Sequence, residues 1–218
     1  FSGGKDSYLA LQYASVDHKI SCLLTLESEK EDSWMFHTPA IEWTKLQAKA
    51  MEIDHLISKT SGVKEEELED LGSIIESAIS KYSIEGIVTG ALASVYQSTR
   101  IQKICNDLGL WCFNPLWQMP QKQLLQELLS NKIESIITGI AAEPFDDTWL
   151  GRCIDSECVD DLMSLESKYR INPAGEGGEI ESFVLNAPLF HKSVRIIESN
   201  KYYSNFTGKL EIKKALLI

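Results

Sequence analysis

The chain has 218 residues, of which 44% are hydrophobic and 24% charged, and its formal net charge is -11. This composition is typical of a globular protein with one large core, or one core and a small appended domain. A net negative charge disfavours broad attachment to nucleic acid, because that affinity comes mainly from lysine and arginine at phosphates. No apolar run approaches the roughly 20 residues of a membrane span, so we expect a cytoplasmic protein without a membrane partner.

The segment Ser2-Gly3-Gly4-Lys5-Asp6-Ser7 opens the chain, and the apolar pattern after it predicts a helix. Adjacent glycines permit positive φ and close approach to an anion, while a helix N-terminus and Lys5 supply positive charge. We interpret the segment as a phosphate loop rather than a glycine turn before a helix capped by aspartate. Its spacing differs from that of the common P-loop NTPases. It resembles the SGGxDS loop of the ATP pyrophosphatases, which hold the pyrophosphate when ATP is split into AMP and PPi.

Only Phe1 precedes this loop, whereas such a loop follows a strand. We therefore expect the sequence to lack its natural N-terminal strand. Further along, apolar runs predict strands at residues 20–26, 55–58, 86–90 and 133–141, and helical spacing predicts helices at 40–52, 64–82, 95–108 and 120–129. Strands that alternate with helices predict βαβ units and an α/β fold with a doubly wound parallel sheet.

The chain changes character after about residue 147. A short helix at 159–169 is followed by β-rich runs, including a predicted hairpin across Gly208. We predict an ATP-binding domain at 1–147 and a smaller C-terminal β-rich α+β region at 148–218 for the substrate.

Ligands of doubly wound sheets bind at the carboxyl ends of the strands. The phosphate loop and the strand ends at 24–26 and 89–91 are therefore expected to surround one crevice. Gly90 would let the backbone approach the nucleotide closely. Leu24 and Thr25 either line the adenine pocket or belong to the sheet core.

A second candidate site is the acidic loop, residues 175–181, in which Glu176, Glu179 and Glu181 stand on a backbone that includes Gly177 and Gly178. Carboxylates this close in the sequence repel one another unless a cation neutralises their charge. Alone, the segment is typical of a solvated turn. In a chain that opens with a phosphate loop, it indicates the other half of an active site.

Together these motifs resemble the diphthine–ammonia ligases, ATP pyrophosphatases that complete the diphthamide modification of translation elongation factor 2. The resemblance covers nearly the whole chain, although Ile180 and Ser182 stand where the family usually has Phe and Thr. The matching segments are 2–7, 35–38, 85–91, Tyr96-Gln97 with Arg100, 115–117, 150–152, 175–182 and 187–190.

The resemblance implies ATP-dependent amidation of diphthine on elongation factor 2 by ammonia, through an acyl-adenylate that releases PPi and then AMP. The loop amides, with Ser2, Lys5 and Ser7, would stabilise the departing pyrophosphate. Asp6 would hold Mg²⁺ or cap the helix. Glu176, Glu179 and Glu181 would act catalytically on the acceptor and on ammonium.

Further side chains are candidates for substrate binding. Tyr96, Gln97 and Arg100 lie on one predicted helix and either contact phosphate or the acceptor carboxylate, or form a surface turn. His37 either takes part in catalysis or nucleotide contact, or has a structural role at a helix start. Arg152 binds substrate or forms an ion pair.

Two other functions remain open. A tRNA-modifying ATP pyrophosphatase would use the same loop, but the five cysteines contain no C-x-x-C pair for zinc. A non-catalytic nucleotide-binding protein would bind ATP without releasing PPi. A homo-oligomer is compatible with the sequence.

Overall fold

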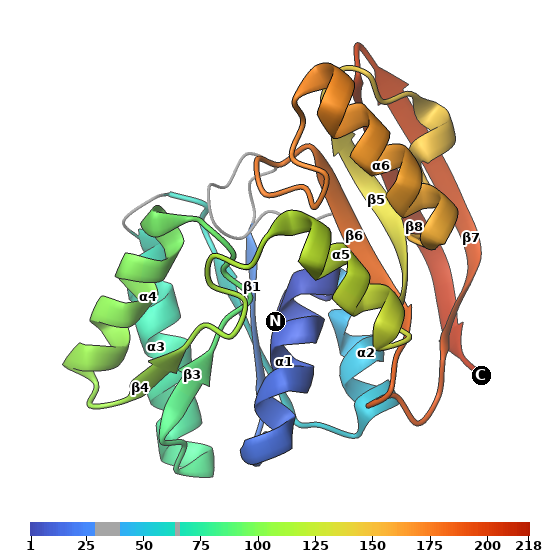
Figure 1. Ribbon diagram of the computed structural model, residues 1–218. Coiled ribbons are helices and arrows are strands. Elements are labelled where there is room, and N and C mark those ends of the chain that lie inside the picture. The colour runs from blue at the N-terminus through green and yellow to red at the C-terminus, as the bar shows by residue number, and fades with distance from the viewer. Residues whose placement is uncertain (29–39, 64–65) are drawn as a thin grey trace.

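The computed structural model describes residues 1–28, 40–63 and 66–218, and Figure 1 shows an N-terminal α/β part beside a C-terminal sheet. The N-terminal elements are α1 (Lys5–Asp17), β1 (Leu23–Ser28), η1 (Ile41–Trp43), α2 (Thr44–Met51), β2 (His55–Thr60), α3 (Glu66–Tyr82), β3 (Gly86–Val88), α4 (Val95–Asp107) and β4 (Trp111–Phe113). The remaining elements are α5 (Gln121–Ser130), β5 (Glu134–Ala141), η2 (Asp147–Trp149), α6 (Ser156–Tyr169), β6 (Ile180–Asn186), β7 (Val194–Ser204) and β8 (Thr207–Leu217). No helix among these residues is long and apolar enough to cross a membrane.

Parallel strand pairs confirm the α/β class of the N-terminal part. β1 pairs with β2 and β3 pairs with β4, both in parallel. The sequence did not predict β4, because three residues are too short to show a period. Phe1 lies beside β1, since its amino group donates to the Leu24 carbonyl and its carbonyl accepts from Thr25 Oγ1 at 2.6 Å.

The C-terminal sheet is antiparallel, with strand order β6-β5-β8-β7. The expectation that residues 133–141 join the parallel sheet is therefore wrong. A continuous apolar run indicates a strand buried on both faces, but it carries no information about the direction of its neighbours. The sheet of the C-terminal region thus begins at Glu134, before the predicted boundary at residue 147.

The β7–β8 hairpin turns at Asn205 and Phe206, whose φ angles are 49° and 61°. Positive φ at both central residues is the geometry that matches the twist of a two-residue hairpin. The predicted turn at Gly208 is wrong, since this glycine lies within β8. A Cβ at Gly208 would stand 2.8 Å from the Tyr202 carbonyl oxygen, so the glycine serves close strand packing.

A large core joins α1, α5 and α6 to the C-terminal sheet, and its fully buried members include Leu128, Ile137 and Phe183. Within it Tyr8 of α1 accepts a hydrogen bond from the Leu189 amide at 2.9 Å. A smaller cluster lies between α3, α4 and the parallel strands. Because α1 follows the predicted phosphate loop directly, its packing against the C-terminal sheet fixes the loop relative to that sheet.

Candidate active site

The predicted phosphate loop is a tight turn that leads into α1 at Lys5. Gly3 has a φ of 79° and Gly4 a φ of -80°, so one of the two glycines uses the positive φ that the sequence permits. The Ser7 hydroxyl donates to the Gly4 carbonyl at 3.1 Å, and Ser2 Oγ lies 3.1 Å from Ser7 Oγ. The two serines therefore close the loop with hydrogen bonds of its own.

The two loop glycines also allow other parts of the chain to pack closely against the loop. A Cβ at Gly4 would stand 3.1 Å from the Ser182 carbonyl oxygen, and one at Gly3 would overlap the side chain of Gln47. These contacts give the two glycines a packing role in addition to the predicted approach to an anion. The sequence could not show this, because the neighbours come from α2 and β6.

Gln47 holds the loop against β6, a role that the sequence did not predict. Its side chain is 0% exposed, and Nε2 donates to the Gly3 carbonyl at 2.9 Å and to the Val184 carbonyl at 2.8 Å. A second hydrogen bond joins the loop to β6, since the Ser182 hydroxyl accepts from the Lys5 amide at 3.1 Å. Gln47 lies one turn after Thr44 on the buried face of α2, and buried polar groups require partners, so a glutamine on this face was the signal available in the sequence.

Replacing Gln47 by Leu should lower the free energy of unfolding by about 1–3 kcal/mol, because the Val184 carbonyl loses a buried donor. The loop should also lose its fixed position, so ATP affinity should fall. Denaturant titration and ATP titration measure the two effects. Gln126→Leu, on the exposed face of α5, is the matched control and should change neither. Normal ATP affinity in Gln47→Leu would remove Gln47 from the account of the loop.

Lys5 and Asp6 form the charged centre of the loop. The Lys5 side chain is almost fully buried and its Nζ lies 2.8 Å from Asp6 Oδ2. The other carboxylate oxygen, Asp6 Oδ1, is buried and has no hydrogen-bond partner among the described residues. Helix α1 has Gly4 as its N-cap without a side-chain cap bond, so Asp6 does not cap it. An orphaned carboxylate oxygen beside a phosphate loop fits a Mg²⁺ ligand.

No three His, Cys, Asp or Glu side chains gather into a ready metal site within residues 1–28, 40–63 and 66–218. A Mg²⁺ at Asp6 would therefore draw its other ligands from phosphate oxygens and water, which is its usual mode in nucleotide sites.

Gly90 packs directly against the loop. A Cβ at this position would lie 2.8 Å from the Asp6 carbonyl carbon and 2.8 Å from the Ser7 nitrogen. Since both atoms belong to the backbone, neither can move aside as a flexible side chain would. Gly90 thus allows the end of β3 to meet the start of α1.

We expect Gly90→Ala to displace the loop, lower stability by about 1–3 kcal/mol and weaken ATP binding, because overpacking forces a backbone shift. Gly72→Ala is the control, since nothing lies within 4 Å of its added Cβ in α3. That change should instead stabilise the helix by about 0.5–1 kcal/mol. Thermal unfolding and ATP titration of both variants provide the measurement. If Gly90→Ala binds ATP as well as Gly72→Ala does, the loop does not depend on this contact.

Two carboxylates of the acidic loop lie near Lys5 and Asp6. Burial raises the pKa of Glu181 to about 7, with Lys5 opposing the shift and Asp6 adding to it. Burial likewise raises the pKa of Glu176, against hydrogen bonding from the backbone of Ala93 and Ser94. The Ala93 amide donates to Glu176 Oε1 at 2.9 Å. Since the Lys5 amide also donates to the Ser182 hydroxyl, the structure brings the phosphate loop and the acidic loop together around one charged cluster.

Glu179 is engaged within the acidic loop itself. Its carboxylate accepts from the Asn172 amide at 3.0 Å, from Asn172 Nδ2 at 2.6 Å and from the Gly177 amide at 2.8 Å. A Cβ at Gly177 would lie 2.8 Å from both carboxylate oxygens, and Gly178 has a φ of 85°. These contacts fit a carboxylate that shapes the loop, with the two glycines required by that shape.

The start of α4 meets the acidic loop through the Ala93–Glu176 hydrogen bond, which brings the first helical turn with Tyr96 and Gln97 toward the cluster. The Arg100 guanidinium stacks 3.5 Å from the centre of the Tyr96 ring. Substrate contact by these three residues stays a prediction.

Three other candidates have structural partners. Arg152 pairs with Asp161 at 2.6 Å and lies over the Trp149 ring, which fits the ion-pair alternative. Thr25 is buried, with its hydroxyl bonded to Phe1, and Leu24 packs on the smaller core, so both fit the sheet-core alternative. His37 lies outside the described residues.

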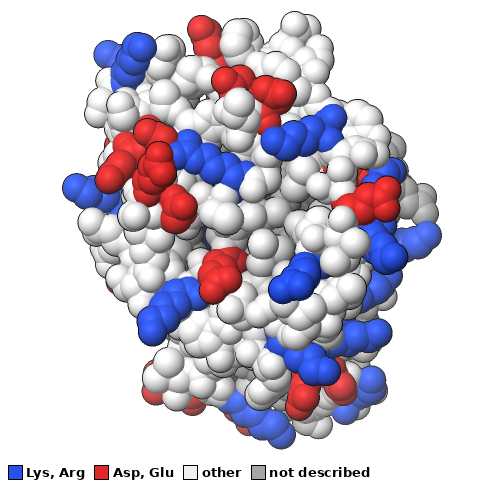
Figure 2. All heavy atoms as spheres, turned by 90° about the vertical axis from the view of Figure 1, so that its right-hand side faces the viewer, with Lys and Arg blue, Asp and Glu red and all other residues white. Residues whose placement is uncertain are grey.

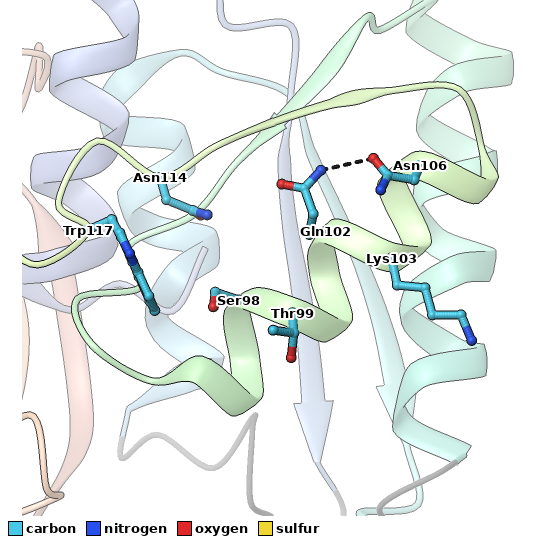
Figure 3. A pocket seen from close by; sticks show the side chains of 7 residues that line it. All are labelled: Ser98, Thr99, Gln102, Lys103, Asn106, Asn114 and Trp117. Carbon is cyan, nitrogen blue, oxygen red and sulfur yellow. Dashed lines mark hydrogen bonds between the residues drawn. The ribbon is translucent and has the colours of Figure 1, made fainter.

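A shallow pocket of about 400 Å³ runs along α4, outside this cluster. Figure 3 shows its polar lining together with the Trp117 ring, and the lining residues are Ser98, Thr99, Gln102, Lys103, Asn106, Asn114 and Trp117. None of the predicted site residues lines it. Asn114 accepts a hydrogen bond from the Thr89 hydroxyl, and Thr89 directly precedes Gly90 in the chain.

Comparison with known proteins covers both halves of the chain. Residues 1–112 match the model of the diphthamide synthase N-terminal domain, and residues 120–218 match that of the diphthamide synthase C-terminal domain. The diphthine–ammonia ligase of Bos taurus is 35% identical over 92% of this chain and 82% of its own length. The enzyme of Homo sapiens is 34% identical with the same coverage. That of Schizosaccharomyces pombe is 32% identical over 92% of this chain but 35% of its own length.

A solved structure, described as a predicted subunit of tRNA methyltransferase from Methanocaldococcus jannaschii, is 15% identical with a TM-score of 0.38 and covers 86% of this chain and 94% of that one. Its similarity is too low to decide anything about fold or function. The family matches and the named relatives confirm both the predicted resemblance and the enzyme class, an ATP-dependent ligase. Because the two family models together span nearly all of its residues, this chain belongs to the diphthamide synthase family.

Proposed function

We propose that this chain amidates the diphthine of elongation factor 2 with ammonia, using ATP and Mg²⁺ and passing through an acyl-adenylate. The observation that carries the proposal is the cluster of Lys5 and Asp6 from the phosphate loop with Glu176 and Glu181 from the acidic loop. The relatives named diphthine–ammonia ligase indicate the acceptor and the nitrogen donor.

The phosphate loop would serve the first step. The diphthine carboxylate oxygen attacks the α-phosphorus of ATP, the new O–P bond forms, and the bond from phosphorus to the pyrophosphate oxygen breaks. Lys5 and the α1 N-terminus stabilise the negative charge that gathers on the departing PPi. Asp6 Oδ1 would hold Mg²⁺, which neutralises phosphate charge.

The acidic loop would serve the second step. Ammonium gives one proton to Glu181, whose pKa of about 7 lets this carboxylate accept a proton at neutral pH. The resulting ammonia attacks the acyl carbon, the bond from this carbon to the AMP oxygen breaks, and the new amide nitrogen loses a second proton to water. Glu176 stands beside the same cluster and can attract the trimethylammonium group of diphthine. Glu179 positions both carboxylates through its bonds within the loop.

The products distinguish this function from its rivals. Incubation with ATP, ammonium and diphthine-bearing elongation factor 2 should release AMP and PPi only when the acceptor is present, as measured by ion-exchange chromatography. ADP as the main acceptor-dependent product would refute the adenylate. Stimulation of PPi release by tRNA instead of the elongation factor would favour a tRNA-modifying enzyme, and ATP binding without any PPi would favour a non-catalytic protein.

A further inference from the structure

Charge is unevenly distributed along this chain. Residues 191–218 contain six basic and two acidic side chains and so have a net charge of +4. Since the whole chain has a net charge of -11, the other 190 residues together have a net charge of -15. Figure 2 views the molecule from the side of β7 and the chain end, and basic side chains are spread over that face among several groups of acidic ones. The last 28 residues of an acidic chain thus carry a net positive charge.

The same segment exposes apolar side chains. Among the described residues twelve large hydrophobic side chains are exposed, and six of them belong to β7, β8, their turn and the last residue. These six are Ile197, Tyr202, Tyr203, Phe206, Leu216 and Ile218. β7 is an edge strand, and its outer edge pairs with no strand in the part of the chain that the structure describes. Three of the six, Ile197, Tyr202 and Tyr203, lie on this edge strand, and exposed apolar groups on an edge strand are a common feature of interaction sites.

This surface is continuous with the candidate active site through the sheet. Gly139 of β5 pairs with Glu181 of β6 on one side and with Lys209 of β8 on the other. Two strand spacings separate Glu181 from Lys209, a distance of about 10 Å. Cross-strand partners share a face of the sheet, so the exposed Lys209 extends the row that begins at Glu181.

We propose that the hairpin surface, meaning the exposed side chains of β7 and β8, docks an acidic surface of the protein acceptor and thereby presents the residue to be modified to Glu181. The identity of that acceptor as elongation factor 2 rests on the proposed function. A protein is favoured over RNA because the net charge of -15 on the other residues repels an extended polyanion. The open edge of β7 also offers backbone groups that a protein strand can pair with.

The test compares two double variants with the same net charge of -15, each replacing two exposed basic residues by glutamate. One is Arg195→Glu with Lys209→Glu on the hairpin surface, and the other is Lys19→Glu with Lys122→Glu away from it. The Kd of each full chain for diphthine-bearing elongation factor 2 is measured by biolayer interferometry at low and at high salt, without ATP. The hairpin variant should bind about tenfold more weakly at low salt and lose most of that difference at high salt, because salt screens exposed charges. The control should stay within about twofold of the wild type.

Each outcome shows whether the hairpin surface binds the protein acceptor, binds nucleic acid or binds neither. Equal weakening in both double variants, or no measurable binding by the wild type, would overturn the docking surface. A single-stranded RNA probe that binds the wild type and not the hairpin variant, with unchanged acceptor affinity, would assign the surface to nucleic acid. The glutamine pair Arg195→Gln with Lys209→Gln provides a milder test if the reversal unfolds the protein. Acceptor binding that depends on the hairpin but leads to no amide would refute the proposed function and leave the docking surface standing.

Discussion

Lys5→Ala should reduce acceptor-dependent PPi release by about 10²- to 10³-fold, the usual effect of removing one preorganised group that stabilises transition-state charge. The Lys5 ammonium is buried at the start of α1, where the departing pyrophosphate gathers negative charge in the proposed reaction. Its partner Asp6 keeps 36% of its side chain exposed, so water can solvate the carboxylate that the change leaves unpaired. The variant should therefore fold and lose chemistry rather than structure.

Quenched-flow measurement of PPi, with circular dichroism to verify the fold, provides the test. Lys19→Ala, an exposed lysine beyond the end of α1, is the control and should release PPi at the wild-type rate. Asp6→Asn preserves the shape of its side chain but removes the charge, and it should weaken the dependence of the rate on Mg²⁺ concentration. A folded Lys5→Ala variant with an unchanged rate would exclude the loop from the mechanism.

Glu181→Gln should reduce amide formation by about 10²-fold or more, the range of general acid–base contributions, while ATP affinity stays within about twofold of the wild type. Glutamine has nearly the same shape as glutamate, but it cannot accept a proton from ammonium. The rate of the first step, measured as PPi release, should fall much less than the rate of amide formation. If the variant instead binds ATP more weakly, but forms amide at the normal rate once ATP is bound, Glu181 belongs to the nucleotide site.

Glu181→Gln should lower activity but raise the stability of the protein, measured without nucleotide or Mg²⁺. Burial raises the folded-state pKa of Glu181 from 4.5 to about 7, so the folded state retains its proton where the unfolded state has lost it. The wild type should therefore lose stability as pH rises from about 4.5 to 7, by about 3 kcal/mol in total. Glu181→Gln should lack this loss and unfold at a higher temperature than the wild type at pH 8. Glu85→Gln, which changes an exposed carboxylate, should keep the wild-type pH profile.

Local features of the sequence predicted local structure well. The apolar stripe over 64–82 predicted α3, and the two adjacent glycines permitted the positive φ that Gly3 has and Gly4 does not. Helix α6 begins three residues before its predicted start, because the carboxylate of Asp155 accepts from the Cys158 amide and caps it. Such errors at helix ends arise where a cap, rather than an apolar period, decides the boundary.

The features that the sequence did not reveal are tertiary. The apolar pattern of β5 could not show that its partners run antiparallel, and the polarity of Gln47 could not show that it binds the backbone of Gly3 and Val184. Three glutamates of the acidic loop looked equivalent, yet Glu179 alone bonds within the loop. Partners distant in the chain decide each of these roles, and periodicity within one segment does not report them.

The central claim is that this chain joins ammonia to the diphthine carboxylate at the expense of ATP, with AMP as the leaving group. The most direct measurement is mass spectrometry of diphthine-bearing elongation factor 2 after incubation with this protein, ATP and nitrogen-15 ammonium. We expect one labelled nitrogen in each modified acceptor, strict dependence on ATP, and one AMP for each amide formed. An acceptor that stays unlabelled, a label that enters without ATP, or ADP in place of AMP would contradict the account.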